Sequence, residues 1–154
     1  IKILGGATVP QRILGSLPSN WEVLEFDPFG PEAFLQSIDV YVYFHHPDWV
    51  EAFGRAACEA ILAGVPTILP HSFEPLFKSA ALYCDPHEVL SLVEKLRDDP
   101  EFYKRCSEAG RAEMISRFGT GRHIERLVEA GVLPPQASNP TLASMSVGGN
   151  AASR

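Results

Sequence analysis

The stretch "EAFGRAACEAILAGVPTILP", residues 51–70, has the pattern that decides the fold. Its many small residues predict a helix over about residues 53–63 that lies close to a sheet. Gly64 is a typical C-terminal stop for such a helix. The apolar run that follows, residues 66–69, predicts a strand. A loop, a tight helix and a buried strand in this order are typical of an α/β protein.

Apolar runs alternate with helical patterns on both sides of this stretch. Pro31 and Pro86 open predicted helices, where a missing N–H has no cost. Asp85 with Glu88 forms a predicted capping box, and Asp99 is the predicted N-cap of the next helix. The predicted strands are residues 1–4, 21–26, 39–44, 66–69 and 81–84, and the predicted helices are 31–38, 53–63, 85–99, 99–119 and 121–130. This order predicts an α/β fold with a Rossmann-like open parallel sheet and helices on both faces.

Length and composition describe one globular domain of 154 residues. We expect residues 1–130 to form this domain, which opens in mid-strand and is predicted to be truncated at its N-terminus. Residues 131–154 contain one charge and three prolines and predict a flexible tail. A net charge of −6 argues against a nucleic-acid partner. No run of 18 apolar residues is present, so we predict no membrane span and expect a cytoplasmic protein.

The chain has three cysteines, Cys58, Cys84 and Cys106. Their spacings match no zinc pattern, and an odd number does not make a disulfide framework. We therefore expect buried or half-buried reduced thiols and no metal site.

Ligands of an open α/β sheet bind beyond the carboxyl ends of its strands. The strand over residues 39–44 ends before His45, and the loop after it carries Glu51. The unpaired N–H groups at the start of the next helix can bind an anion or a hydroxyl, and Gly54 lets a ligand approach the backbone. On the same helix, the carboxylate of Glu59 can accept hydrogen bonds from a vicinal diol such as that of ribose.

Each of these residues also has a purely structural interpretation. A pair of glutamates eight positions apart arises by chance in a chain with 13 glutamates, and a helical glutamate is usually solvated. Arg55 can meet a phosphate or pair with Glu59 four positions later. Three further residues near the predicted strand ends, His46, Trp49 and Glu74, are weaker candidates. Of the adjacent His45 and His46, at most one is expected to face the site.

The stretch "DVYVYFHHPDWVEAFGRAACEAILAGVPTILP", residues 39–70, resembles the donor-site region of retaining glycosyltransferases of the GT-B fold, glycosyltransferase family 4. The shared pattern is an apolar strand, a loop, E-x-F-G-x4-E on a helix, and Gly-Val-Pro before a strand. The helices over residues 85–118 also look like the closing helices of that family. The resemblance covers about residues 1–127.

The resemblance implies that the chain is the nucleotide-sugar-binding half of a glycosyltransferase that acts with retention and needs no metal or cofactor. It implies that Glu51 is the catalytic residue and contacts the donor sugar. It also implies that Glu59 holds the ribose diol, and that the backbone at Phe53 and Gly54 approaches the sugar and diphosphate. Arg55 and His45 complete the predicted donor site. The acceptor is unknown and would be bound by an N-terminal domain of the same protein.

The chain departs from the family pattern in one respect. The family's donor domain normally opens with a further strand and a loop that carries an Arg and a Lys for the diphosphate, and neither is present here. Three other interpretations therefore stay open: a nucleotide-sugar epimerase of GT-B type, a non-catalytic nucleotide-binding domain, and a glycoside hydrolase with two carboxylates about 5–10 Å apart.

Overall fold

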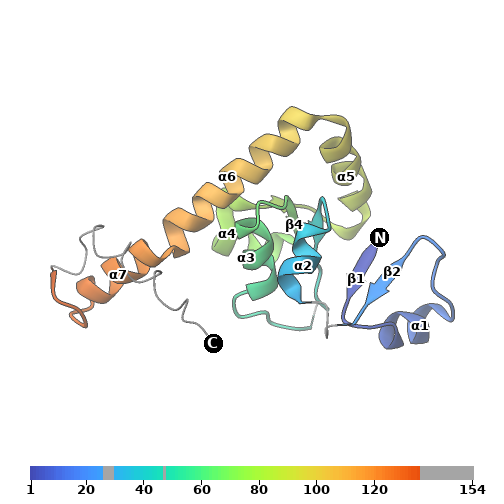
Figure 1. Cartoon of the computed structure of the whole chain (residues 1–154), viewed down its shortest axis with the longest axis horizontal. Coiled ribbons are helices and arrows are strands. Elements are labelled where there is room, and N and C mark those ends of the chain that lie inside the picture. Colours follow the sequence, from blue (N-terminus) through green and yellow to red (C-terminus); the bar gives the residue numbers. More distant parts are fainter. Residues whose placement is uncertain (26–29, 47, 136–154) are drawn as a thin grey trace, which may run out of the picture.

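The computed structural model of the chain describes residues 1–25, 30–46 and 48–135 (Figure 1). Its helices are α1 (Thr8–Leu14), α2 (Pro31–Gln36), α3 (Arg55–Leu62), α4 (Glu74–Phe77), α5 (Val89–Asp98), α6 (Pro100–Phe118) and α7 (Thr120–Glu129). Its strands are β1 (Lys2–Leu4), β2 (Glu22–Leu24), β3 (Tyr41–Val42), β4 (Thr67–Leu69) and β5 (Leu82–Tyr83). The described chain is therefore an α/β structure, as the sequence predicts.

Every strand pair is parallel, but the strands form two sheets and not the single open sheet that was predicted. One sheet is β1-β2, and the other has the order β3-β4-β5. The strands are two or three residues long, shorter than the apolar runs that contain them. Among the described residues, no strand joins the two sheets. The single Rossmann-like open sheet is therefore not confirmed among the described residues, which form two small parallel sheets.

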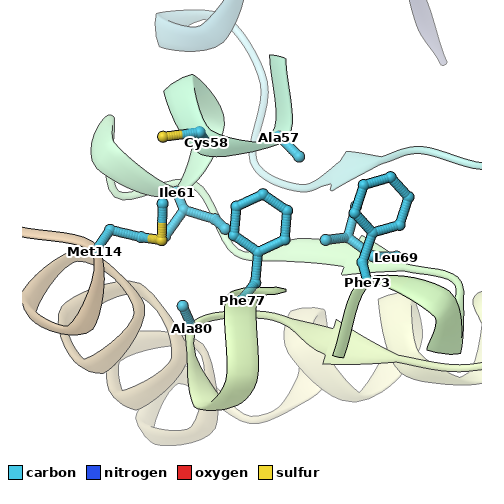
Figure 2. Close-up of a cluster of buried hydrophobic side chains, with 8 residues drawn as sticks. All are labelled: Ala57, Cys58, Ile61, Leu69, Phe73, Phe77, Ala80 and Met114. Carbon is cyan, nitrogen blue, oxygen red and sulfur yellow. The ribbon is translucent and has the colours of Figure 1, made fainter. Parts of the chain in front are cut away.

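Strand β4 lies in the middle of the three-stranded sheet and is buried on both faces. Leu69 packs with α3, α4 and α6 in a cluster that includes Phe77 and Met114 (Figure 2). Ile68, the preceding residue, packs on the other face with Leu96 of α5. Both Ile68 and Leu69 are fully buried. Because successive strand residues point to opposite faces, this continuous apolar strand requires helices on both sides of the sheet.

Side chains of the long helix α6 bond to the segments that lead into β3 and β4. The Oγ of Ser107 donates to the carbonyl of Gly64 at 2.6 Å, and the hydroxyl of Tyr103 donates to the carbonyl of Asp39 at 3.0 Å. At Gly110, an added Cβ would lie 2.6 Å from the carbonyl oxygen of Ala80. The lack of a side chain at Gly110 therefore permits α6 to pack directly against the 3-10 turn Lys78–Ala80.

The two acid-capped helix starts form as predicted. The amide of Asp85 donates to Glu88 at 2.9 Å, and Asp99 accepts from the amide of Phe102 at 2.8 Å. Two helices were not predicted, α1 and α4. Helix α1 has no buried residue, and α4 is one turn that follows the 3-10 turn His71–Phe73.

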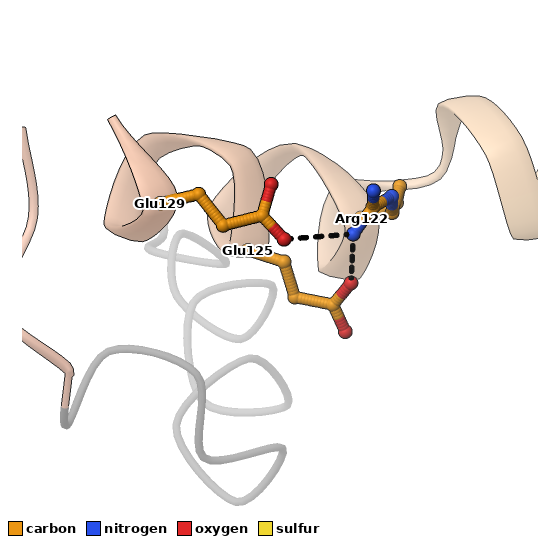
Figure 3. A network of polar contacts seen from close by, with 3 residues as sticks. All are labelled: Arg122, Glu125 and Glu129. Atoms are coloured by element: carbon orange, nitrogen blue, oxygen red, sulfur yellow. Dashed lines mark hydrogen bonds and ion pairs between the residues drawn. The ribbon is translucent and has the colours of Figure 1, made fainter. Parts of the chain in front are cut away.

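Helix α7 is the last described element and follows α6 (Figure 1). On its surface, Arg122 donates to Glu125 at 2.9 Å and to Glu129 at 3.3 Å (Figure 3). Exposed pairs of this kind contribute about 0–1 kcal/mol each. The predicted tail begins at Gly131, but residues 136–154 lie outside the described residues. No helix in the described ranges is long and apolar enough to cross a membrane.

Candidate functional site

Glu51 lies on the loop after β3 and has two hydrogen-bond donors. Its Oε1 accepts from the amide of Gly54 at 3.1 Å, and its Oε2 accepts from the hydroxyl of Tyr43 at 3.2 Å. The Gly54 amide lowers the pKa of the Glu51 carboxyl, and the Tyr43 hydroxyl, the Phe53 amide and nearby His45 lower it further. Glu51 is exposed and ionised at neutral pH, and its carboxylate holds the loop against the start of α3.

Gly54 forms the turn into α3 and has a left-handed backbone, with φ of 73° and ψ of 53°. A Cβ at this position would lie 2.7 Å from a ring carbon of buried Phe73. The first helical hydrogen bond joins the amide of Cys58 to the carbonyl of Gly54 at 3.0 Å. The amides of residues 55–57 come before this first bond and so have no acceptor within the helix. Such amides at a helix N-terminus can bind an anion.

An aromatic group surrounds this turn. The ring of His45 lies 5.6 Å from that of Phe73 and 6.3 Å from that of Tyr43, between centroids. Its neighbour His46 instead lies near Asp48, at 3.7 Å, and near Trp49. The two histidines thus contact different groups, as alternation along an extended segment predicts. Only His45 lies next to Tyr43, the hydroxyl donor of Glu51.

The ring of Phe53 contacts two other aromatic rings, although the residue is 36% exposed. The ring packs edge-on against Phe118 at 5.4 Å and lies 6.2 Å from Phe77, between centroids. Phe53 therefore anchors the loop to the C-terminal end of α6. The role that the family resemblance implies for Phe53 belongs to its backbone and does not conflict with this packing.

Glu59 has a partner in Arg55, four residues earlier on α3. The Nε of Arg55 lies 3.4 Å from Oε1 of Glu59, and the side chains are 88% and 42% exposed, respectively. The pair is thus open to solvent, and Coulomb attraction between its members is weak there. Breaking this pair therefore costs little free energy. A ligand hydroxyl can replace Arg55 as the partner of Glu59, and a ligand phosphate can replace Glu59 as the partner of Arg55.

A cavity of about 650 Å³ lies beside this pair. Arg55, Ala56 and Glu59 line it on the α3 side, and the rest of its wall comes from β1, β3, the region of α2 and Val93 of α5. Burial raises the pKa of the Tyr41 hydroxyl to about 12, with smaller contributions from Tyr43 and Glu59. Tyr41, which also lines the cavity, is therefore a neutral hydroxyl at any physiological pH.

The structure does not bring all the predicted site residues to one cavity. Arg55 and Glu59 line it, whereas the Glu51 carboxylate, His45, Phe53 and Gly54 belong to the turn at the N-terminus of α3 and are not part of its wall. Glu74 is an exposed residue at the start of α4, 4.0 Å from His71. The predicted residues thus form two neighbouring groups joined by α3.

Sequence reasoning missed two residues of this region, Tyr43 and Phe73. Tyr43 has the same strand parity as His45, so the period-two pattern of the strand could have identified it. Phe73 comes from a 3-10 turn far along the chain, and no pattern near residue 54 could have indicated it.

The three thiols are free within the described residues, with Cys58 and Cys84 buried and Cys106 half-buried, as expected. Burial raises the pKa of all three. They are protonated at neutral pH, which makes them poor nucleophiles.

Asp85, His87 and Glu88 lie close enough to share an ion, but all three are exposed. The carboxylate of Glu88 already accepts from the amide of Asp85 within the capping box. The group therefore has a structural role at the start of a helix.

Comparisons with protein-family models, with curated proteins and with solved structures found no match.

Proposed function

We propose that the chain is the donor-binding half of a retaining glycosyltransferase of the GT-B fold, family 4, that acts in the cytoplasm. The observation that carries the proposal is the α3 start. A left-handed glycine turn follows the carboxyl end of β3, with an ionised glutamate before it and Glu59 on a cavity wall after it. In a parallel α/β arrangement this is the edge at which ligands bind.

The roles proposed for each residue follow from their positions. Glu59 accepts from the ribose diol of a nucleotide-sugar, and Arg55 moves from Glu59 to a phosphate. The amides of residues 55–57 face the diphosphate, whose charge increases as the sugar leaves. No metal takes part in this scheme.

Glu51 is proposed to bind the hydroxyls of the donor sugar and to be the catalytic residue. Its carboxylate has two oxygens and about four acceptor positions, so the bonds from Gly54 and Tyr43 leave room for sugar hydroxyls. His45, beside Tyr43, borders the same position. The acceptor is bound by an N-terminal domain of the same protein.

One observation favours a second candidate, a nucleotide-binding domain that transfers no sugar. The Glu51 carboxylate already holds the start of α3, and this explains the residue without any substrate. An epimerase of GT-B type has no observation of its own in its favour. Nucleotide binding is common to these functions, so the first experiment tests it directly.

The experiment is calorimetric titration of the chain with UDP, GDP and ADP and with their 2′,3′-dideoxy forms. We expect one nucleotide to bind, and its dideoxy form to bind more weakly by about 1.5–3 kcal/mol for each hydrogen bond lost to a charged acceptor. Glu59→Gln should weaken the native nucleotide to the level of the dideoxy form. Glu108→Gln, an exposed glutamate on α6, is the matched control and should change nothing.

Equal binding of native and dideoxy nucleotides would refute the role of Glu59. No binding of any nucleotide would refute the proposed function for this chain. Glu51→Gln separates the two candidates in the intact protein: a large loss of sugar transfer with unchanged nucleotide affinity supports the transferase. No transfer by the unmutated protein supports the non-catalytic domain.

A further inference from the structure

Tyr43 lies at the carboxyl end of β3, and the fold fixes both its backbone and its ring. Its amide donates to the carbonyl of Ile68 at 3.1 Å, which ties this position to β4. Its ring packs against the buried cluster of Figure 2 and meets the ring of Phe73 nearly edge-on, at 6.0 Å between centroids and 77° between planes. The hydroxyl at the end of the ring therefore has a defined position at the edge of the sheet.

The hydroxyl of Tyr43 and the amide of Gly54 bond to different oxygens of Glu51. The hydroxyl donates to Oε2 at 3.2 Å, and the amide donates to Oε1 at 3.1 Å. One donor comes from the end of β3 and the other from the turn into α3. The terminal torsion of a glutamate is broad, so a single hydrogen bond would leave the carboxylate free to turn. Two bonds on separate oxygens fix its plane.

The two donors differ in what else they do. The Gly54 amide belongs to the turn that starts α3, so it cannot be removed without changing that turn. The Tyr43 hydroxyl bonds to Glu51 and to no other group in residues 1–25, 30–46 and 48–135. This bond is exposed to water, which competes for both groups, so its net contribution to the fold is small. The hydroxyl therefore acts on Glu51 alone.

The electrostatics of the pair match this role. Burial raises the pKa of the Tyr43 hydroxyl, and the bond to Glu51 raises it further, so the hydroxyl is protonated and can donate at neutral pH. The Gly54 amide is the largest cause of the lowered pKa of Glu51, and desolvation opposes it. The Tyr43 hydroxyl, the Phe53 amide and the nearby His45 lower this pKa as well. A neutral donor thus holds an anionic acceptor that has lone pairs left for other donors.

We propose that Tyr43 is a positioning residue for Glu51. Its hydroxyl and the Gly54 amide hold the carboxylate in one orientation, in which the remaining acceptor positions bind hydroxyls of the donor sugar. Tyr43 does not contact the sugar in this scheme and acts only through Glu51. The inference rests on the proposed function, because that function assigns a sugar to Glu51. It extends the function by naming a residue that favours sugar-bearing nucleotides over free nucleotides.

The first measurement needs no ligand. The pKa of the Glu51 carboxyl is followed by NMR titration of the chain with ¹³C-labelled glutamate, and its signal is assigned by its absence in Glu51→Gln. Tyr43→Phe removes the hydroxyl and keeps the ring, so the pKa of Glu51 should rise toward its ordinary value of 4.5. Tyr103→Phe is the matched control, because that hydroxyl donates to the carbonyl of Asp39 at 3.0 Å. It should leave the pKa of Glu51 unchanged.

The second measurement is calorimetric titration of the same variants with UDP, GDP and ADP and with UDP-glucose, GDP-mannose and ADP-glucose. Tyr43→Phe should weaken the nucleotide-sugar that binds about threefold to tenfold, and change the affinity for the corresponding nucleoside diphosphate by less than about twofold. Tyr103→Phe should change neither affinity. In the Glu51→Gln background, Tyr43→Phe should cause no further loss, because Tyr43 acts through Glu51.

An unchanged pKa of Glu51 in Tyr43→Phe would overturn the inference, because the bond would then be absent in solution. Equal weakening of the nucleotide-sugar and the nucleoside diphosphate would also overturn it, since the hydroxyl would then only support the loop. A further loss in the Glu51→Gln background would place Tyr43 on the ligand itself and refute its action through Glu51. Failure of the proposed function gives a different result. No nucleotide then binds to the unmutated chain, Tyr43→Phe still raises the pKa of Glu51, and the sugar-positioning role of Tyr43 fails together with that function.

Discussion

Replacing Gly54 by alanine tests whether the turn before α3 is as restricted as the structure indicates. Alanine at φ of 73° occupies the left-handed region, at a cost of about 1–2 kcal/mol. Its Cβ would also lie 2.7 Å from a ring carbon of Phe73, which is 4% exposed and enclosed by the core. Displacing such a ring costs typically about 1–3 kcal/mol. We therefore expect Gly54→Ala to lower the free energy of unfolding by about 2–5 kcal/mol.

The control lies at the other end of the same helix. Gly64 also has a positive φ, of 82°, but an added Cβ would meet only the Oγ of Ser107, at 3.3 Å. Gly64→Ala therefore has the backbone cost with little steric cost, about 1–2 kcal/mol. Both variants are compared with the unmutated chain by urea denaturation at equilibrium, followed by circular dichroism and with the slopes compared.

The difference between the two variants measures the contact with Phe73. A double variant of Gly54→Ala with Phe73→Leu should recover part of the loss, because the smaller side chain leaves room for the methyl group. If Gly54→Ala and Gly64→Ala are equally destabilised, and Phe73→Leu gives no recovery, the close approach of the turn to Phe73 is not present in solution.

Three further predictions concern other parts of the chain. First, the pKa of Glu51 is lowered in the folded state from its ordinary value of 4.5, so its stabilising effect is present above that value and is lost as pH falls through the folded pKa. As the pH is lowered from about 5 to about 3, the free energy of unfolding should therefore fall less for Glu51→Gln than for the unmutated chain. Both are measured by urea denaturation at each pH, and an equal fall for the two proteins would contradict the prediction. Second, Gly110→Ala should lower the free energy of unfolding by at least about 1–3 kcal/mol, because its Cβ would meet the Ala80 carbonyl oxygen at 2.6 Å. Its control Gly121→Ala, with no atom within 4 Å, should be neutral or stabilising, and similar denaturation midpoints for the two would refute the close packing of α6. Third, a thiol reagent at pH 8 should label the native chain slowly and label three cysteines after unfolding in urea, because burial raises the pKa of each thiol. Rapid labelling of a buried cysteine in the native chain would contradict that burial.

Local chemistry in the sequence determined much of the secondary structure. The pairs Asp85 with Glu88 and Asp99 with Phe102 form at the helix starts where the sequence predicts them, because capping depends on residues three positions apart. The parallel α/β class followed from the order of apolar runs and helical patterns. Helix α1 was missed because its residues have no buried apolar face, which is the feature that periodicity detects.

The candidate site was predictable only in part. The positions of Glu51, Gly54 and Glu59 around the start of α3 follow from one continuous stretch, and the period of the helix places Arg55 next to Glu59. Their functional roles stay predictions. The packing of Phe53 against Phe118 could not be predicted, because the two residues are far apart in the chain and meet only through the path of α6.

The sequence by itself determined most of the helices and strands, though not α1 or α4, since those preferences depend on neighbours a few residues away. Only the tertiary structure decided how the strands assemble. Parallel strands are joined by long crossover connections, so no local sequence pattern indicates which strand pairs with which. The tertiary structure separated β1 from β3 and placed a cavity between them where one sheet was predicted. The same packing placed Phe73 next to Gly54, where a Cβ would collide with its ring. Glycine is therefore required at this turn for a reason that the local sequence does not show.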